Sequence, residues 1–243
     1  MNERFRRWSQ AAARALLPCS CALCQARCDA AVCAACSAAF ILPRIARCPR
    51  CANPCAAADA FRACGACQAG RPAFDATIVA ADYAPPLDQL ILQLKFGAAL
   101  ALAPWLAGML RQTLLTGTRP RLPNLLCPVP LSAARLQQRG YNQALEIARP
   151  LARTLGIALH PRLAIRAIDT PPQSGASPGE RKRNIKHAFI VAPDSLALVR
   201  GQHIGVVDDV MTSGHTLDEL ASTLKRFGAA RVTNLVFART PPH

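Results

Sequence analysis

The sequence predicts an α/β fold, in which a mostly parallel β-sheet flanked by helices follows a small cysteine-rich module. Short strand-like apolar segments alternate with helical periodicity along residues 72–243, and this alternation is typical of parallel sheets. Four Cys-x-x-Cys pairs crowd into the segment before it. The chain has 243 residues, enough for one sizeable α/β domain and a small second unit. We therefore place the cysteine module at residues 18–70 and the sheet domain at residues 72–243.

The order of the elements follows from apolar periodicity and from the turn residues between periodic segments. Pro85 and Pro86 precede the first helix of the sheet domain, and proline is favoured in the first helical turn. The segment 168–183 is rich in proline and glycine, so we expect it to be disordered. In chain order we expect a strand at 77–83, helices around 87–94 and 100–115, a strand at 125–129, a loop at 130–140, a helix at 142–155, strands at 188–191 and 203–208, a helix at 216–227 and a last strand at 231–238.

The composition argues against a disordered chain and against a membrane-spanning helix. Hydrophobic residues make up 51% and charged residues 18%, which is a globular composition. No apolar run approaches the ~20 residues that a spanning helix needs. The formal net charge is +15, and residues 111–186 hold 13 basic but only three acidic side chains. This excess suits a polyanion, either nucleic acid or a phosphorylated small molecule. A basic surface that contacts only solvent would show the same excess of positive charge.

Twelve cysteines indicate a metal-binding module. Eight of them form four Cys-x-x-Cys pairs, and each pair places two thiolates on one tetrahedral ion. Two pairs complete a closed four-thiolate zinc site, so we predict two structural Zn²⁺ ions. The simplest arrangement joins the first pair to the second and the third to the fourth, and an interleaved arrangement stays open. The predicted ligands are Cys21, Cys24, Cys33, Cys36, Cys48, Cys51, Cys64 and Cys67.

The remaining cysteines and the choice of metal leave alternatives. Cys19 and Cys28 lie close enough to the first pair to compete as ligands, and Cys55 and Cys127 stay unassigned. An iron–sulfur cluster is the alternative metal centre, but the ribbon-like spacing of the pairs disfavours it. No convincing secretory signal precedes the pairs, so this many thiols indicate metal in a reducing compartment rather than a disulfide framework. We therefore expect a cytoplasmic protein.

The segment 203–216 carries the most informative pattern of the sheet domain. An apolar strand ends in Asp208 and Asp209, and a loop of small residues, Thr212–Thr216, then opens a helix. The backbone N–H groups of such a loop and the helix N-terminus suit a phosphate, while paired carboxylates accept hydrogen bonds from a diol. Direct Mg²⁺ ligation by the two acids would leave the loop without a role, and a Walker A loop needs a lysine that is absent. We interpret the segment as a ribose 5-phosphate site at the carboxyl end of a parallel strand.

The segment Val206–Thr216 resembles the motif with which type I phosphoribosyltransferases bind 5-phosphoribosyl 1-pyrophosphate (PRPP). Nearly the whole chain, roughly residues 19–240, resembles the ComF (ComFC/GntX-like) family. This resemblance implies a sheet of the type I phosphoribosyltransferase kind behind a double zinc ribbon. The features that carry it are the cysteine pairs, Leu94-Lys95-Phe96, Pro128-Val129-Pro130-Leu131, Arg139-Gly140-Tyr141-Asn142-Gln143, Gln173, Glu180-Arg181, Asn184 and the PRPP motif.

The resemblance also implies roles for individual residues. Asp208 and Asp209 would bind the ribose hydroxyls, and they would be the catalytic pair if the chain transfers the sugar. Mg²⁺ would accompany PRPP and bridge its ribose and pyrophosphate groups. Arginines following the strand at 125–129, Arg135 and Arg139, would meet the pyrophosphate, and Arg181 would contact phosphate from a closing loop. The 5′-phosphate would lie against Thr212, Ser213, Gly214, His215 and Thr216.

For the whole protein, the resemblance implies a PRPP-binding protein of the competence type that acts in uptake of single-stranded DNA during natural transformation. Its partners would then be single-stranded DNA and other DNA-uptake proteins. The protein would be cytoplasmic and would associate peripherally with the inner membrane. Aromatic residues total only 5%, which offers little for base stacking. The alternative function is transfer of the phosphoribosyl group to an acceptor. The acceptor is unidentified, because no base-binding element is recognisable in the sequence.

Overall fold

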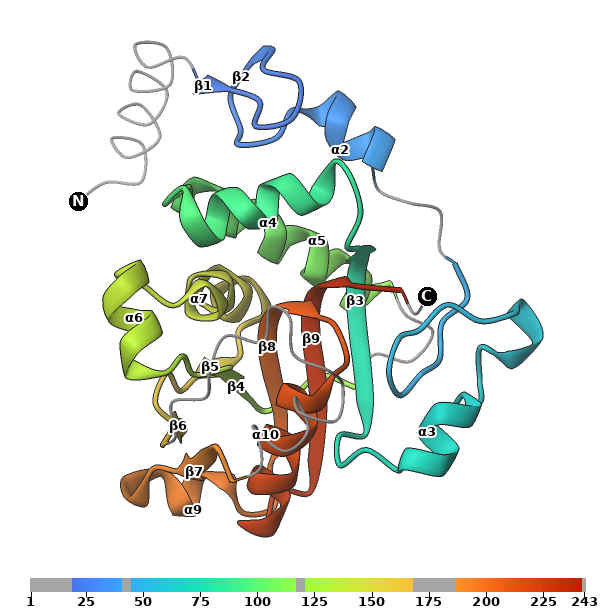
Figure 1. The fold of residues 1–243 in the computed structure, drawn as a ribbon, viewed down its shortest axis with the longest axis vertical. Helices are drawn as coiled ribbons and strands as arrows, with labels where there is room; N and C mark the ends of the chain where they lie inside the picture. The colour runs from blue at the N-terminus through green and yellow to red at the C-terminus, as the bar shows by residue number, and fades with distance from the viewer. Residues whose placement is uncertain (1–18, 41–44, 117–120, 168–186, 242–243) are drawn as a thin grey trace.

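The computed structural model describes residues 19–40, 45–116, 121–167 and 187–241, and a five-stranded parallel sheet forms its centre (Figure 1). The strand order is β3-β9-β8-β4-β5, and every neighbouring pair in it runs parallel. In the middle of the sheet, Val207 of β8 is in register with Pro128 of β4 and Leu235 of β9. The strands are β3 (Ala76–Asp82), β4 (Leu125–Pro128), β5 (Ala158–Leu159), β8 (His203–Met211) and β9 (Arg231–Arg239).

Helices cover both faces of this sheet, which explains why its central strands are apolar on both sides. Val206 packs in a core with residues of α10, whereas the next residue, Val207, packs in a second core with residues of α4, α5 and α7. Figure 1 shows α10 on the opposite side of the sheet from α4 and α5. The helices of these two layers are α4 (Leu87–Phe96), η2 (Leu100–Leu102), α5 (Ala103–Leu115), α7 (Gln143–Leu155) and α10 (His215–Arg226).

Short elements complete the fold outside the central sheet. Two two-stranded antiparallel sheets pair β1 with β2 and β6 with β7. Their bounds, and those of the short helices, are β1 (Cys19–Ser20), β2 (Arg27–Cys28), α2 (Ala34–Phe40), η1 (Ala57–Asp59), α3 (Gly65–Gly70), α6 (Ala133–Arg139), β6 (Ala164–Arg166), β7 (Phe189–Val191), η3 (Pro193–Ser195) and α9 (Leu196–Val199).

The cysteine module packs against the sheet domain at two separate places. In its first half, residues 19–40, the Ser37 Oγ accepts a hydrogen bond of 2.9 Å from the indole N–H of Trp105 on α5. In its second half, residues 45–70, the carbonyl of Pro49 accepts a 3.3 Å hydrogen bond from the N–H of Thr77 on β3. We call these halves the first and second ribbon. Across the described ranges, no helix combines the length and the apolar character needed to cross a membrane.

Most of the predicted elements are present, and three predictions were wrong. The predicted loop at 130–140 contains the helix α6, because Ser132 caps its start and Gly140, at φ +79°, ends it. The strand at 188–191 is present but pairs with β6 in a separate hairpin rather than joining the parallel sheet. The strand at 203–208 continues to Met211, because its pairing with β9 continues to the end. The segment 168–183 lies outside the described residues.

Candidate functional site

The last part of β8 holds two neighbouring carboxyl groups in different surroundings. Asp209 is buried, at 2% exposure, while Asp208 is half-buried. The Lys95 Nζ at the end of α4 lies 2.7 Å from the Asp209 Oδ2. The side-chain amide of Gln143, at the start of α7, donates to the Asp209 Oδ1 at 3.3 Å. The fold therefore gives Asp209 a counter-ion and a donor from two helices of the layer that covers this face.

These surroundings move the pKa values of the two carboxyl groups in opposite directions. Burial and the neighbouring charge of Asp209 raise the pKa of Asp208 well above its usual range. Burial also acts to raise the pKa of Asp209, but the charge of Lys95 and the hydrogen bonds to this carboxylate outweigh it, so the pKa of Asp209 is lowered. Asp209 is thus held as a carboxylate within the protein, whereas Asp208 keeps its proton to a higher pH than an ordinary aspartate.

A pocket of about 300 Å³ lies beside these groups. Its size suits a small phosphorylated ligand, and its polar lining comes from α4, α6, α7, β6, β8, the turn that follows β8, the start of α10 and Tyr83 after β3. Asp208 and Asp209 lie at the carboxyl end of a central parallel strand, where open α/β sheets bind ligands. The polar residues that carry the argument are Lys95, Arg135, Asp208, Asp209, Thr212 and Thr216.

The turn between β8 and α10, where the sequence predicts a phosphate loop, is built around a glycine in the left-handed region. Gly214 has φ +82°, a conformation that favours glycine, whereas a Cβ there would meet only the flexible end of the Met211 side chain, so the conformation rather than the space requires glycine. Thr212 and Ser213 are exposed ahead of the helix. The Ser213 Oγ is 3.1 Å from the His215 Nδ1. The first turn of α10 leaves backbone N–H groups for an anion beside the two hydroxyl side chains.

The predicted phosphate-contacting arginines do not lie in equivalent positions. Arg135 lines the pocket from α6. Arg139, at the end of α6, instead donates to the side-chain Oε1 of Gln143 and stacks at 5.3 Å over the ring of Phe96. Arg181 lies outside the described residues. The structure therefore brings Arg135 to the two carboxyl groups, while Arg139 reaches them through Gln143.

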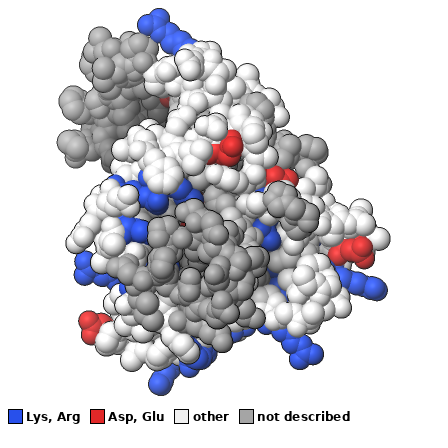
Figure 2. Space-filling view, viewed as in Figure 1, with Lys and Arg blue, Asp and Glu red and all other residues white. Residues whose placement is uncertain are grey.

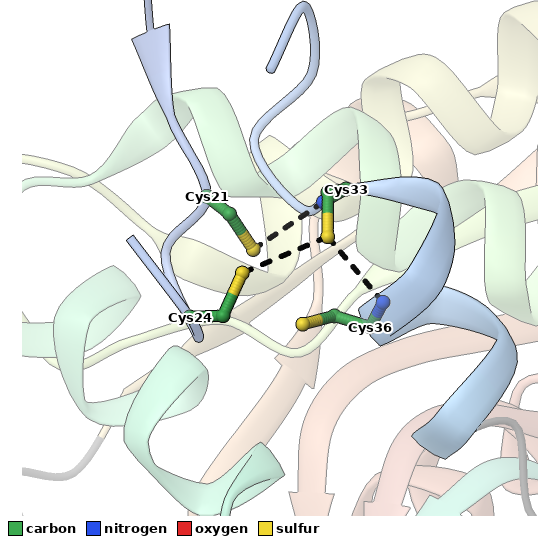
Figure 3. Close-up of side chains that lie close together, drawn as sticks. All are labelled: Cys21, Cys24, Cys33 and Cys36. Carbon is green, nitrogen blue, oxygen red and sulfur yellow. Dashed lines mark hydrogen bonds between the residues drawn. The ribbon is translucent and has the colours of Figure 1, made fainter. Parts of the chain in front are cut away.

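The eight paired cysteines form two separate clusters of four. Within each cluster the four sulfur atoms lie within 4.8 Å of one another. Figure 3 shows the four side chains of the first cluster gathered together. The clusters join the first pair to the second and the third to the fourth, so the consecutive arrangement is present and the interleaved one is not. Cys19, Cys28 and Cys55 lie outside both clusters, and Cys127 is buried in β4. The clusters are Cys21, Cys24, Cys33 and Cys36, and Cys48, Cys51, Cys64 and Cys67.

The chemistry of these clusters fits zinc. All four donors are thiols, as in closed structural zinc sites, and backbone N–H groups donate to the sulfurs. The N–H of Cys33 donates to the Cys21 Sγ at 3.3 Å, and the N–H of Cys64 donates to the Cys48 Sγ at 3.3 Å. Burial raises the pKa of Cys51 to about 11. Burial also acts to raise the pKa of Cys48, but hydrogen bonds from backbone N–H groups outweigh it and lower the pKa of Cys48 to about 7. A divalent cation removes this conflict by stabilising all four thiolates together.

Comparison with known proteins places these features in a family. The DNA utilization protein YhgH of Salmonella typhimurium is 37% identical over 212 residues, which cover 86% of this chain and 90% of that protein. The protein of the same name from Escherichia coli strain K12 is 36% identical over the same coverage. Competence protein F of Haemophilus influenzae is 32% identical over 176 residues, covering 70% of this chain and 75% of that protein. The chain belongs to the ComF family.

A family profile described as the phosphoribosyl transferase domain matches residues 142–242 of this ComF chain. The match covers α7, β8, the turn and α10, whereas Lys95 of α4 and Arg135 of α6 line the pocket from outside it. The family and the fold class predicted from the sequence are therefore confirmed: a ComF-type protein with a parallel sheet of the phosphoribosyltransferase kind and a cysteine-cluster region before it.

The Arg-Gly-Tyr-Asn-Gln block of this ComF chain connects the elements that build the pocket. The Tyr141 hydroxyl donates to the carbonyl of Leu94, next to Lys95. The Asn142 side chain caps α7 and donates to the carbonyl of Val129, after β4, at 3.0 Å. The block therefore joins the end of α4, the end of β4 and the start of α7, where Gln143 meets the carboxylate of β8.

The polar pocket residues Lys95, Gln143, Tyr83 and Arg166 were not among the predicted site residues, and two of them, Lys95 and Gln143, contact Asp209. Both belong to short motifs that carried the family resemblance, and that resemblance was the only signal for them. Neither is near Asp209 in the sequence, so no local pattern predicts their contacts. Only the packing of α4 and α7 on the sheet brings them to the carboxylate.

Proposed function

We propose that this ComF protein binds the 5-phosphoribosyl group of PRPP in the pocket at the end of β8. The observation that carries the proposal is the juxtaposition, in one pocket of about 300 Å³, of two carboxyl groups with the hydroxyl side chains of a glycine turn. Asp208 accepts hydrogen bonds from the ribose diol. The turn Thr212–Thr216 and the first turn of α10 hold the 5′-phosphate, and Arg135 lies on the side where the pyrophosphate would bind.

Metal ions complete the proposed complex. Each cysteine cluster holds one structural Zn²⁺, because four thiolates fill the tetrahedral coordination and leave no position for substrate. Mg²⁺ enters with PRPP and offsets the charge of its phosphates. The half-buried carboxyl group of Asp208 is the group of this chain that faces the ligand, while Asp209 remains paired with Lys95.

Calorimetric titration of the zinc-loaded protein with Mg·PRPP tests this proposal. We expect saturable binding by the wild type, and about 10- to 150-fold weaker binding by Asp208→Asn, because a hydrogen bond to a charged acceptor contributes about 1.5–3 kcal/mol. Asp194→Asn is the matched control, since Asp194 is exposed on η3 away from the pocket. Failure of the folded wild type to bind Mg·PRPP would refute the proposal.

The raised pKa of Asp208 gives the same titration a pH signature. The ionised carboxylate accepts hydrogen bonds from both hydroxyls of a diol more strongly than the protonated acid does, and the raised pKa keeps Asp208 protonated to a higher pH than an ordinary aspartate. Affinity is therefore expected to fall as pH drops through this raised pKa, and the fall should begin above the usual aspartate range. The Asp208→Asn variant should lack this pH dependence.

We further propose that the protein acts on single-stranded DNA in the cytoplasm, in contact with DNA-uptake proteins at the inner membrane. The relatives named DNA utilization protein and competence protein support this role, and so does the net charge of +15. On the face drawn in Figure 2, basic side chains gather between α4 and α6. Phosphoribosyl transfer to an unidentified acceptor is the second candidate function, favoured by the retention of both Asp208 and Asp209 in the pocket.

The DNA role predicts a steep salt dependence. If the protein neutralises about four phosphates of an oligothymidylate, the slope of log K against log salt is about −2.8, and affinity falls about 50-fold between 50 and 200 mM salt. Fluorescence anisotropy with a labelled oligonucleotide measures this slope. Asp208→Asn should leave it unchanged, because that residue faces the sugar-phosphate pocket. Weak binding with a flat salt response would contradict the DNA role.

A further inference from the structure

Arg239 is a buried arginine that connects the second ribbon to the phosphate turn. It ends β9 and is only 6% exposed. Its Nη1 donates to the carbonyl of Met211 at 2.9 Å, to the carbonyl of Thr212 and to the carbonyl of Thr240 at 2.7 Å. Its Nε donates to the carbonyl of Cys51, a member of the second cysteine cluster, at 3.2 Å. One guanidinium therefore holds the end of β8 and a residue of the cluster together.

The chemistry of the guanidinium suits this role. It is planar, carries five N–H donors in a fixed fork and accepts no hydrogen bonds, so backbone carbonyls on two sides satisfy it. A buried charge that lost one of these carbonyls would be destabilised, because burial penalises unpaired polar groups. The position of the Cys51 carbonyl and the position of the Met211 and Thr212 carbonyls are therefore linked through one rigid side chain.

Two further contacts tie the second ribbon to the same turn. The N–H of Ala73, just after the ribbon, donates to the Oδ1 of Asp218 in the first turn of α10 at 2.6 Å. Cysteines of the second cluster also share one hydrophobic core with Met211 and Leu217, which flank the turn on both sides. The Met211 side chain lies beside Gly214, so one side chain packs both in this shared core and at the phosphate turn.

The first ribbon has different neighbours. Its cysteines Cys21 and Cys36 share a core with residues of α4, α5 and α7, and its hydrogen bond to the sheet domain comes from Trp105. Within the described ranges, residues 19–40 make no hydrogen bond to the turn or to α10. The two cysteine clusters therefore differ in what they position.

We propose that Arg239 is a positioning residue of the phosphate turn, through which a metal ion in the second cluster and PRPP stabilise each other, while the first cluster is not coupled. The proposal rests on PRPP binding at this turn. A metal-bound second ribbon holds the Cys51 carbonyl in place, and Arg239 then holds the carbonyls of Met211 and Thr212. Coupling between two binding sites is reciprocal, so PRPP must also retain the metal.

The first arm of the test compares the two clusters. Cys64→Ser removes a ligand of the second cluster, and Cys24→Ser removes one from the first. Calorimetry with Mg·PRPP is expected to give about 5- to 150-fold weaker binding for Cys64→Ser, the usual range of coupling between sites, and an affinity within about twofold of wild type for Cys24→Ser. Equal affinities of the two variants, whether both weakened or both unchanged, would overturn the coupling.

The second arm measures the rate of zinc release, which a merely structural effect of a substitution on PRPP affinity would not change. The two-zinc wild-type protein is mixed with a chromogenic chelator, with and without Mg·PRPP. PRPP is expected to slow the release of one of the two ions, and Arg239→Lys, which keeps the charge but loses the fork, is expected to abolish this protection while both ions still bind. Arg231→Lys, at the opposite end of β9, is the matched control and should retain protection.

The outcomes separate this inference from the proposed function. If the wild type binds Mg·PRPP but PRPP protects neither ion or both ions equally, the coupling is wrong and the PRPP site stands. If PRPP still slows zinc release in Arg239→Lys, Arg239 does not connect the second cluster to the phosphate turn. If the wild type does not bind Mg·PRPP at all, the two proposals fall together.

Discussion

Replacing Lys95 by methionine is expected to destabilise the folded protein by about 3–5 kcal/mol, because the substitution leaves the buried Asp209 carboxylate without its counter-ion. The Lys95 Nζ lies 2.7 Å from the Asp209 Oδ2, and the side-chain exposures are 23% and 3%. The other partners of that carboxylate, the amide of Gln143 and the side chain of Asp208, carry no compensating positive charge. Urea unfolding of wild type and variant at neutral pH measures the difference.

Two control variants separate the charge from the change of shape. Lys225→Met breaks the ion pair with Asp75, whose side-chain exposures are 31% and 23%, and a more exposed pair of this kind contributes about 0–1 kcal/mol. Combining Lys95→Met with Asp209→Asn removes both charges and should recover a large part of the lost stability. If Lys95→Met alone were as stable as wild type, the Asp209 carboxylate would not need Lys95.

The Lys95 effect should also depend on pH in a defined direction. In wild type the pKa of Asp209 is lowered, so its stabilising contribution is present above the pKa of the unfolded chain and is lost as pH falls. Without Lys95, burial dominates and the carboxyl group of the variant takes up a proton at higher pH. The difference in the free energy of unfolding between wild type and Lys95→Met is therefore expected to be largest at neutral pH and to decrease on acidification.

Local patterns in the sequence predicted the parts of the site that are local in the chain. The two aspartates, the glycine turn and the helix after it are consecutive, so their apolar and polar order alone specified strand, turn and helix. The cysteine pairs are similar, because each Cys-x-x-Cys brings two thiols together within a single turn. Even the arrangement of the pairs, which the sequence left open, is the one with the shortest connections.

The parts that were missed depend on long-range packing or on weak local signals. Asp208 and Asp209 are equivalent in the sequence, and only the approach of α4 and α7 pairs one of them with Lys95 and Gln143. The sequence predicts a loop at 130–140 although Ser132 and Gly140 are good capping residues, because a helix of only 7 residues gives a short apolar period. The hairpin of β6 and β7 has no short-range pattern that separates it from a strand of the central sheet.

Removing zinc from both clusters is expected to unfold the ribbons while the central sheet stays folded. The ribbons have few buried residues besides their cysteines, so little apolar burial can replace the metal, and structural zinc contributes about 10–16 kcal/mol in small modules. Both cores of the sheet include cysteines of the ribbons, but most of their members come from the strands of the sheet and from α4, α5, α7 and α10, so we expect these cores to persist without the metal. Metal analysis should first give two zinc ions per chain.

Hydrogen exchange before and after chelation measures this difference. Amides of residues 19–40 and 45–70 should lose protection, while those of β4, β8 and β9 keep it. Cys55→Ser is the matched control, because Cys55 lies within the second ribbon but outside its cluster, and this variant should still bind two ions. Loss of protection throughout the sheet would instead mean that the ribbons and the sheet fold as one cooperative unit, so that zinc stabilises the sheet as well as the turn beside it.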